Sequence, residues 1–296
     1  MKMLRIAVLG PGSIGGLIAA LLARTGSPIT CIASTSAAKR LSVEGLKVES
    51  GRFGSFTVPM RATDRLDGPV DILVVAVKST FLDDALFRIP RDVLGSAFVV
   101  PFLNGIEHVA LLRERLPDAI VAPATIRIES ARSSDQTIQQ RSPFATIEIA
   151  QVRPDSENLS EFSLQLKDAG FDVTIRSDEK EMLWEKLAIL APFALLTTAY
   201  GVPAGIIREA HREELEVVAL EMALVARAEN VLVDPSSIVG FFDRVPASMQ
   251  SSMQVDDKAR RPLELEAIGG AVLRSADSHA IAVPATARLV NLLRSV

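Results

Sequence analysis

The sequence predicts an α/β N-terminal domain built on a doubly wound, mostly parallel sheet, followed by an all-α C-terminal domain. The first half alternates short apolar runs with helical patterns, which is typical of strand–helix–strand units. After Ser177 the strand signals disappear and helical periodicity takes over. A length of 296 residues suits two domains better than one. We therefore expect domains over 1–177 and 178–296.

The elements of the first domain are predicted from local patterns. Leu4–Leu9 is a continuous apolar run ended by Gly10, as in a strand buried on both faces. A helix rich in Ala, Leu and Ile follows over Ser13–Thr25, and alternating runs between glycines predict a hairpin over Gly45–Met60. The other expected elements are a helix at Leu159–Ala169 and strands at Pro28–Ala33, Asp71–Val77, Ala97–Phe102, Ala119–Ile128, Thr137–Gln140, Phe144–Ala150 and Phe171–Arg176. We expect the strands between 119 and 150 at a mixed edge of the sheet.

The second domain shows helical periodicity throughout. Helices are expected at Asp178–Tyr200, Glu209–Glu229, Leu263–His279 and Pro284–Leu293. Turn residues punctuate this region at Gly201-Val202-Pro203, Asp234-Pro235 and Val283-Pro284.

Composition narrows the class of protein. The net charge is −4 and no polybasic block is present, so neither a nucleic acid nor an anionic membrane is an expected partner. The single cysteine, Cys31, excludes an internal disulfide and suits a reducing cytoplasm; we interpret it as a buried strand thiol rather than a nucleophile. The apolar run before Gly10 is too short for a signal sequence, and no stretch reaches the roughly 18 uninterrupted apolar residues of a membrane span. We expect a cytoplasmic protein without a metal site.

A glycine motif follows the first strand. Gly10-Pro11-Gly12-Ser13-Ile14-Gly15 matches the dinucleotide fingerprint at the start of a helix. Gly10 permits the tight turn, Gly12 lets the pyrophosphate approach the backbone, and Gly15 lets helix and strand pack closely, while the helix N-terminus attracts phosphates. The sequence therefore predicts a Rossmann dinucleotide site, with a purely structural glycine turn as the alternative.

The end of the second strand bears on which dinucleotide binds. Proteins that prefer NAD usually place Asp or Glu there for the ribose hydroxyls. This chain instead reads Ile32-Ala33-Ser34-Thr35-Ser36, followed by Lys39 and Arg40. The absence of an acid favours NADP(H). The alternative is that Lys39 and Arg40 form only a solvated helix face.

One lysine lies in an otherwise apolar helical segment, Trp184–Ile189. Because lysine is seldom buried without a partner, Lys186 facing a crevice would be a candidate acid–base group. The pattern by itself favours the other interpretation, in which the stem of Lys186 covers apolar surface and the ammonium reaches water.

The order of motifs resembles the ketopantoate reductase family over essentially the whole chain. The residues that carry the resemblance are the glycine motif, Val77-Lys78, Leu103-Asn104-Gly105, Trp184-Glu185-Lys186-Leu187, Ser251-Ser252-Met253, Glu264-x-Glu266-x-Ile268-x-Gly270, Arg274, Ala276, His279 and Ile281-Ala282-Val283-Pro284. The resemblance implies a Rossmann domain followed by a helical domain that carries catalytic and substrate-binding groups.

The resemblance also implies roles for individual residues. Lys186 would be the general acid that protonates the ketone oxygen as hydride arrives, and Glu264 would orient lysine and substrate. Asn104 would lie near the reacting carbonyl and the nicotinamide, Ser252 would contact the polar end of the substrate, and Lys78 would line the dinucleotide site. For Glu264 the alternative is a first-turn acid favoured by the helix dipole after Pro262. The expected dinucleotide contacts are Gly10, Pro11, Gly12, Ser13, Ile14, Gly15, Ser34, Lys78 and Asn104.

Two features depart from the family pattern. The family usually has asparagines four and eight residues after the lysine, whereas this chain has Leu190 and Ala194, which we expect to face the substrate. The family's strand-two arginine is replaced by Ser34. The resemblance implies NADP(H)-dependent reduction of a 2-oxo acid or related ketone, with ketopantoate to pantoate in pantothenate biosynthesis as the default. The alternatives are a paralogue that reduces a less polar carbonyl compound and a non-catalytic dinucleotide sensor. A homodimer is one possible state of assembly.

Overall fold

The structure is a computed structural model that describes residues 3–153 and 156–295. The chain divides into two compact units. Unit 1 comprises residues 1–103 and 108–179, and unit 2 comprises residues 104–107 and 180–296. The boundary expected near residue 177 falls just before this division. Residues 104–107 are notable because they come from the first half of the sequence but pack with unit 2.

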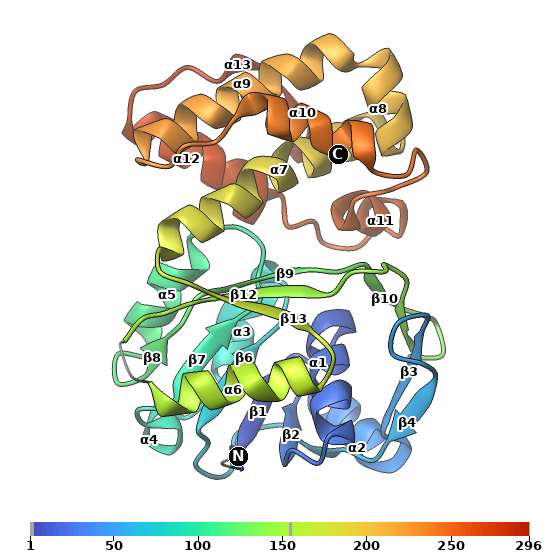
Figure 1. Ribbon diagram of the computed structural model, residues 1–296, viewed down its shortest axis with the longest axis vertical. Helices are drawn as coiled ribbons and strands as arrows, with labels where there is room; N and C mark the ends of the chain where they lie inside the picture. Colours follow the sequence, from blue (N-terminus) through green and yellow to red (C-terminus); the bar gives the residue numbers. More distant parts are fainter. Residues whose placement is uncertain (1–2, 154–155, 296) are drawn as a thin grey trace. The chain divides into compact units, whose positions relative to one another are not determined.

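Unit 1 contains a six-stranded sheet in which all neighbouring strands are parallel (Figure 1). The order is β5 (Arg61–Thr63), β2 (Ile29–Ile32), β1 (Ile6–Leu9), β6 (Ile72–Val75), β7 (Phe98–Pro101) and β8 (Ile120–Val121). Every residue of β1, β6 and β7 is buried, which explains why these strands read as unbroken apolar runs. The predicted doubly wound parallel sheet is confirmed.

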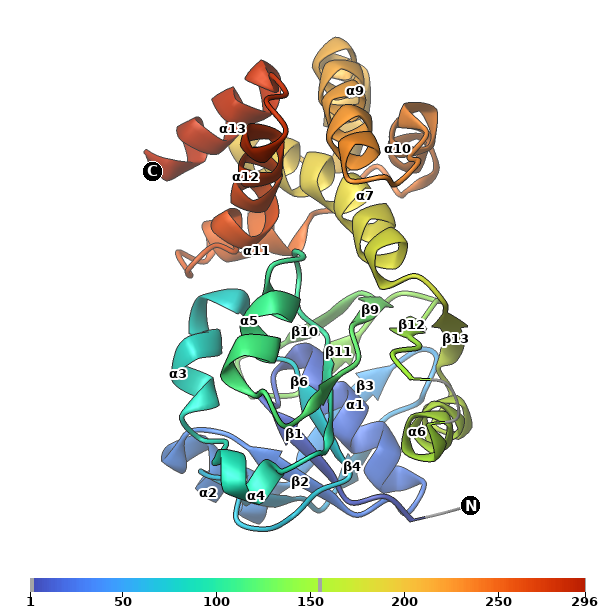
Figure 2. The ribbon, with the colours of Figure 1, turned by 90° about the vertical axis from the view of Figure 1, so that its left-hand side faces the viewer.

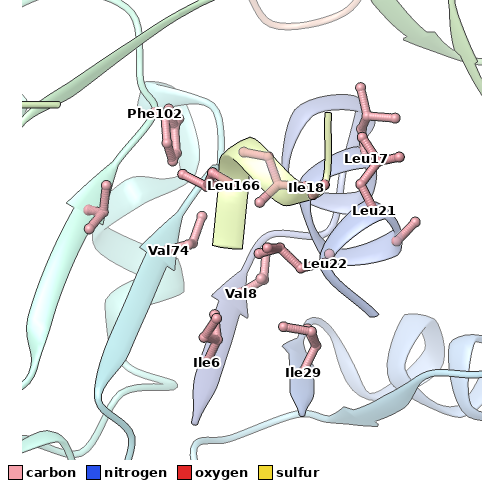
Figure 3. Packing of buried hydrophobic residues seen from close by; sticks show 14 of the residues in the cluster. Ile6, Val8, Leu17, Ile18, Leu21, Leu22, Ile29, Val74, Phe102 and Leu166 are labelled. Atoms are coloured by element: carbon pink, nitrogen blue, oxygen red, sulfur yellow. The ribbon is translucent and has the colours of Figure 1, made fainter. Parts of the chain in front are cut away.

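Helices flank this sheet. They are α1 (Ser13–Arg24), α2 (Thr35–Glu44), α3 (Leu82–Leu86), α4 (Arg91–Leu94), α5 (His108–Arg115) and α6 (Glu157–Asp168), with a 3₁₀ turn at Ser79–Phe81. Figure 2 shows α3 and α5 on one side of the sheet and α1 with α6 on the other. In Figure 3, Ile18 and Leu22 of α1 gather with Val8 of β1, Val74 of β6 and Leu166 of α6 in the core of this unit.

Two small sheets complete unit 1. β10 (Ser130–Arg132), β11 (Ile138–Gln140), β3 (Leu46–Ser50) and β4 (Phe56–Val58) form one, and β13 (Asp172–Arg176), β12 (Thr146–Ala150) and β9 (Ala124–Arg127) form the other. The predicted hairpin over Gly45–Met60 is confirmed as antiparallel β3–β4. The expected mixed edge is wrong, because β9 to β12 pair in these separate sheets. The single strand expected over Ala119–Ile128 is also wrong: the chain leaves the parallel sheet at Pro123, which lacks an amide donor and accepts a hydrogen bond from Ala150.

Cys31 lies in β2 and is fully buried. Burial raises the pKa of its thiol to about 12, so the reactive thiolate is strongly disfavoured at neutral pH. The interpretation of Cys31 as a buried strand thiol is confirmed.

Unit 2 is helical over its described residues. Its elements are α7 (Glu179–Tyr200), α8 (Ala204–Ala210), α9 (Arg212–Ala228), α10 (Pro235–Arg244), α11 (Ser252–Lys258), a π-helical turn at Glu266–Gly270, α12 (Ala271–Ser278) and α13 (Pro284–Arg294). Figures 1 and 2 both show α9 beside α10. The expected helix at Glu209–Glu229 is broken at His211, between α8 and α9. The helix expected at Leu263–His279 is present as the π turn continued directly by α12.

The helix α7 forms the centre of the unit 2 core. It is long and apolar enough to cross a membrane by length and composition, with a mean hydropathy of 1.3 over its best window. However, 72% of that window is buried inside the structure, and core helices of water-soluble proteins pass the same test. Its burial among other helices accounts for its apolar sequence.

Candidate active site

Two glycines of the turn after β1 are required by packing. Gly10 has φ +84°, and a Cβ there would lie 2.9 Å from the Val77 amide nitrogen at the end of the neighbouring strand. A Cβ on Gly15 would collide with the Gly10 carbonyl and lie 2.9 Å from the Ala76 Cβ. These glycines therefore let the turn, α1 and β6 approach one another closely.

Gly12 is different. Its φ is −76°, and the nearest atom to a Cβ built there is the Gly10 carbonyl oxygen at 4.0 Å. The surrounding protein would therefore accept a side chain, and the open space lies where a dinucleotide backbone needs close approach. Gly12 is also the N-cap residue of α1, whose first turn has neither a side-chain cap nor an acidic residue. The N-terminal amides of α1 thus lack a capping side chain, so these residues fit a pyrophosphate.

Strand β10 holds the glycine turn from a distant part of the sequence. Ser130 Oγ donates to the Ser13 carbonyl at 3.1 Å, and Arg132 Nη2 donates to the Pro11 carbonyl at 2.6 Å. The turn's carbonyls are therefore engaged by β10, which fixes the orientation of the peptide planes whose amides would face phosphates. Neither residue can be predicted from the sequence, because no local pattern links positions separated by more than a hundred residues.

The segment after β2 contains both cations and an acid. Ser34 caps α2 by accepting a hydrogen bond from the Ala37 amide at 3.4 Å. Lys39 is exposed, whereas Arg40 is half-buried and donates to Gln136. The residues that directly follow β2 include no acid. The fold brings one to this segment from β5: the carboxylate of Asp64, just after that strand, accepts a 2.7 Å hydrogen bond from Thr35 Oγ1.

Lys78 lies in the segment that follows β6. It is half-buried and immediately precedes the 3₁₀ turn Ser79–Phe81. Val77, the residue before Lys78, packs against Gly10. Lys78 is therefore one residue away from a direct contact of the glycine turn. β1 and β6 are parallel neighbours, which places both following segments at the carboxyl edge of the sheet, where ligands of this architecture bind.

Two predicted catalytic residues meet in unit 2. Asn104 Nδ2 donates a 3.0 Å hydrogen bond to Glu264 Oε2, although 160 positions separate them in the sequence. Glu264 is only 8% exposed, so its carboxylate is oriented in a largely water-excluded setting. The neighbouring Gly105 has φ +82°, and any side chain there would collide with the Ala267 carbonyl of the π turn. The segment after β7 is thus fitted against the π turn, a distortion frequent at functional sites.

Lys186 lies on α7 between buried neighbours. Trp184 and Leu187 are 2% and 1% exposed, whereas Lys186 itself is half-buried. This partial burial is compatible with both interpretations of Lys186 that the sequence leaves open. Of the two positions expected to extend its face, Leu190 is half-buried against the unit 2 core and Ala194 is 1% exposed within it.

The start of α11 shows which of its serines is structurally engaged. Ser252 is exposed, whereas Ser251 is 1% exposed, caps α11 and lies 2.8 Å from Thr197 Oγ1. Thr197 is 11 residues after Lys186, which at about 100° per residue returns it to within about 20° of the same helix face. The start of α11 therefore packs against the α7 face that carries Lys186. Ser252 is the serine that the family resemblance places at the substrate, and Ser251 has no role of its own in that prediction.

Family models decide the relationship to known proteins. The model for ketopantoate reductase PanE/ApbA matches residues 6–154, and the model for its C-terminal domain matches residues 178–296. This chain belongs to the ketopantoate reductase family. The family consists of oxidoreductases that use a nicotinamide dinucleotide.

Individual relatives agree with this assignment. A 2-dehydropantoate 2-reductase of Mycobacterium tuberculosis is 30% identical, with 97% of this chain and 96% of the relative covered. The ternary structure of D-mandelate dehydrogenase with NADH and anilino(oxo)acetate has a TM-score of 0.88 at 17% identity, covering 98% and 97% of the two chains. A dimeric ketopantoate reductase from Staphylococcus aureus has a TM-score of 0.82 at 21% identity, covering 99% and 98%. Because the sequence identities are 17% and 21%, these two structures show that the fold is shared.

Proposed function

We propose that this protein is an NADP(H)-dependent reductase of a 2-oxo acid, with ketopantoate as the default substrate and pantoate, for pantothenate biosynthesis, as the product. The observation that carries the proposal is the Asn104–Glu264 hydrogen bond. It joins two residues that the family resemblance implicates in catalysis, in the unit that also bears Lys186. A protein that only sensed dinucleotides would have no use for this arrangement.

The chemistry assigns a task to each group. A bound dinucleotide supplies hydride to the carbonyl carbon. Negative charge then develops on the carbonyl oxygen, and the Lys186 ammonium stabilises that charge and donates the proton. Glu264, fixed by Asn104, orients the ammonium and the substrate. Gly12 and the first turn of α1 hold the pyrophosphate, and Lys78 and Ser34 line the dinucleotide site.

Replacing the proton donor tests the proposal. Lys186→Met should lower kcat on the preferred 2-oxo acid by about 10²–10⁴-fold, the usual contribution of a general acid. The Kd for NADPH should stay within about twofold, because the glycine turn lies in the other unit. Steady-state kinetics and isothermal titration measure both quantities. Lys180→Met, at an exposed position of the same helix, is the matched control.

If Lys186→Met kept the kcat of the wild-type protein, Lys186 would not be the proton donor, and its role would be to cover apolar surface. If the unmodified protein bound NADPH but reduced no member of a 2-oxo acid panel, the sensor alternative would replace the proposed function.

A second candidate function is reduction of a less polar carbonyl compound. Leu190 and Ala194 stand where the family usually has asparagines, so two amide donors are missing. D-mandelate dehydrogenase, whose ternary structure contains an aromatic oxo acid, has a similar fold. Comparing kcat/KM for ketopantoate with that for phenyl-substituted 2-oxo acids separates the two candidates, because a site built on hydrogen bonds strongly rejects analogues that lack them.

We also propose that the protein is a cytoplasmic homodimer. The single buried cysteine suits a reducing compartment. The outer face of α9 exposes Val217, Leu220 and Leu224 by 46%, 54% and 52%, a continuous apolar stripe of the kind that partners cover. Sedimentation should give twice the 31.8 kDa chain mass, and Leu220→Lys should give a monomer. A monomeric wild-type protein would contradict this part of the proposal.

A further inference from the structure

Two arginines of unit 1 converge on one neutral side chain. Arg40 Nη2, from α2, and Arg132 Nη1, at the end of β10, each donate to Gln136 Oε1 at 3.4 Å. Within the described residues, neither guanidinium forms an ion pair with a carboxylate. The nearby Asp135 carboxylate is engaged in its own turn by Ser133 and Thr137.

In this arrangement the positive charges of Arg40 and Arg132 are not neutralised by a carboxylate of the described residues, and one N–H donor of Arg132 makes no hydrogen bond to them. Burial, and then the charge of Arg40, lower the pKa of Arg132, so the two cations destabilise each other where they stand. The Arg132 Nε is buried and has no hydrogen-bond partner among the described residues. An unsatisfied buried donor and an uncompensated pair of charges both cost free energy. An anion bound between the guanidiniums would remove both costs.

The pair lies beside the dinucleotide-binding turn. Arg132 donates to the Pro11 carbonyl of that turn, and Arg40 comes from the helix that Ser34 caps. In Rossmann domains, the glycine turn and the segment after the second strand are the parts that approach the adenosine ribose. A shallow, solvent-open hollow is lined by both arginines and Gln136, together with Leu41 and Lys47. Glu44 and Asp135 also line the hollow. An anion bound there would have to tolerate both acids; Glu44 is exposed, and the Asp135 carboxylate is held by Ser133 and Thr137.

We propose that Arg132 and Arg40 bind the 2′-phosphate of NADP(H). The inference rests on the proposed function and deepens it. The two cations that select the phosphorylated cofactor are Arg132 at the end of β10 and Arg40 in the second turn of α2. The end of β2 itself carries no cation, because Ser34 stands there. Guanidinium groups suit this task because they make paired, charge-assisted hydrogen bonds to phosphate oxygens. Arg132 would then both hold the glycine turn and read the cofactor.

Isothermal titration of the full chain with four probes tests the proposal: NADPH, NADH, 2′,5′-ADP and 5′-AMP. Arg40→Met should raise the Kd of NADPH and 2′,5′-ADP by about 10- to 100-fold, as expected for losing a charge-assisted contact, and leave NADH and 5′-AMP within about twofold. Gln136→Glu should have the same selective effect, because the new carboxylate neutralises the pair without changing its shape. Arg132→Met should also raise the Kd of NADPH relative to that of NADH.

Two controls isolate the charge effect. Lys39→Met removes a neighbouring cation that is exposed and outside the pair, and should change no Kd by more than about twofold. Asp64→Asn removes the acid near the end of β2, and should leave NADPH binding unchanged or tighter. Retained NADH binding in each variant shows that the glycine turn is folded.

Two results would overturn the inference. One is an unchanged NADPH Kd in both Arg40→Met and Gln136→Glu. The other is an equal loss of NADPH and NADH binding in these variants. That result would mean that the arginines stabilise the glycine turn and do not bind the 2′-phosphate. Either result leaves the proposed function intact as long as NADPH still drives 2-oxo acid reduction. Failure of that reduction in the unmodified protein would instead overturn the proposed function.

Discussion

At the scale of single residues, the glycines of the turn after β1 have different surroundings. Gly10 and Gly15 are held by contacts with Val77, Ala76 and each other, so their absence of a side chain serves folding. Gly12 has open space where its side chain would be. The same motif therefore contains two glycines that packing requires and one, Gly12, whose missing side chain no protein contact requires.

This difference predicts the behaviour of Gly12→Val. The variant should keep the melting temperature of the free protein within about 2 °C, because a Cβ at this position meets nothing closer than 4.0 Å. Binding of NADPH should fall by more than about 100-fold, because the side chain occupies the approach path of the pyrophosphate. Thermal denaturation and isothermal titration provide the readouts.

Two other glycines calibrate that experiment. Gly51→Val, in an exposed turn with no atom within 4 Å of a built Cβ, should change neither quantity. Gly15→Val should fail to fold stably. Undiminished NADPH binding by Gly12→Val would remove this position from the cofactor site.

At the scale of elements, the small sheet β13–β12–β9 is joined by one buried carboxylate. Glu148 of β12 accepts hydrogen bonds from Arg127 at the end of β9 (2.6 Å) and Arg176 at the end of β13 (2.8 Å). Burial alone would raise the pKa of Glu148, but the two guanidiniums outweigh it, and the pKa is lowered. All three strands are therefore connected through an ionised side chain.

The lowered pKa of Glu148 predicts a pH-dependent contribution to stability. A carboxyl whose pKa is lower in the folded state stabilises the fold above its unfolded pKa, and this contribution is lost as pH falls through the folded value. Glu148→Gln should reduce the free energy of unfolding by about 1–3 kcal/mol at pH 7, discounted because Arg127 is 40% exposed. The difference between variant and wild type should shrink below about pH 4.5, the ordinary pKa of a glutamate.

Denaturant melts at pH 7 and pH 3.5 measure this effect. Asp172→Asn, which removes a carboxylate from the neighbouring β13, serves as the comparison because the Asp172 side chain is 61% exposed, and exposed charges contribute little to stability. A Glu148→Gln difference that was equal at both pH values would show that the carboxylate contributes packing rather than charge.

At the scale of the whole molecule, the proposed effect of Leu190 and Ala194 on substrate choice can be compared with how α7 is packed within unit 2. Leu190 and Ala194 occupy the positions of the usual asparagines, but they differ in burial. Ala194 belongs to the helical core, whereas Leu190 is only partly covered by it. An asparagine side chain can therefore be accommodated more easily at position 190 than at position 194.

Leu190→Asn should raise kcat/KM for ketopantoate by about 10-fold or more, because it restores one polar contact, with little change in melting temperature. Ala194→Asn should lower the free energy of unfolding by about 1–3 kcal/mol, because it buries an amide without an assigned partner. Kinetics and thermal melts on both variants give the result. Efficient ketopantoate turnover by the unmodified protein would show that other groups bind the polar end of the substrate.

The sequence by itself determined the features that depend on neighbouring residues. Unbroken apolar runs predict strands buried on both faces, helical periodicity predicts α7, and the spacing of Gly10, Gly12 and Gly15 predicts the turn, because backbone sterics and hydrophobic patterning act over a few residues. The burial of Cys31 follows from the same patterns.

Only the tertiary structure decided which distant residues meet. The contact of Arg132 with Pro11, the convergence of Arg132 with Arg40, and the hydrogen bond from Asn104 to Glu264 link positions that share no local pattern. The separate small sheets and the π turn also arise from packing of whole elements. Such contacts depend on the path of the chain through three dimensions, which local propensity leaves open, and they carry the two proposals that remain to be tested.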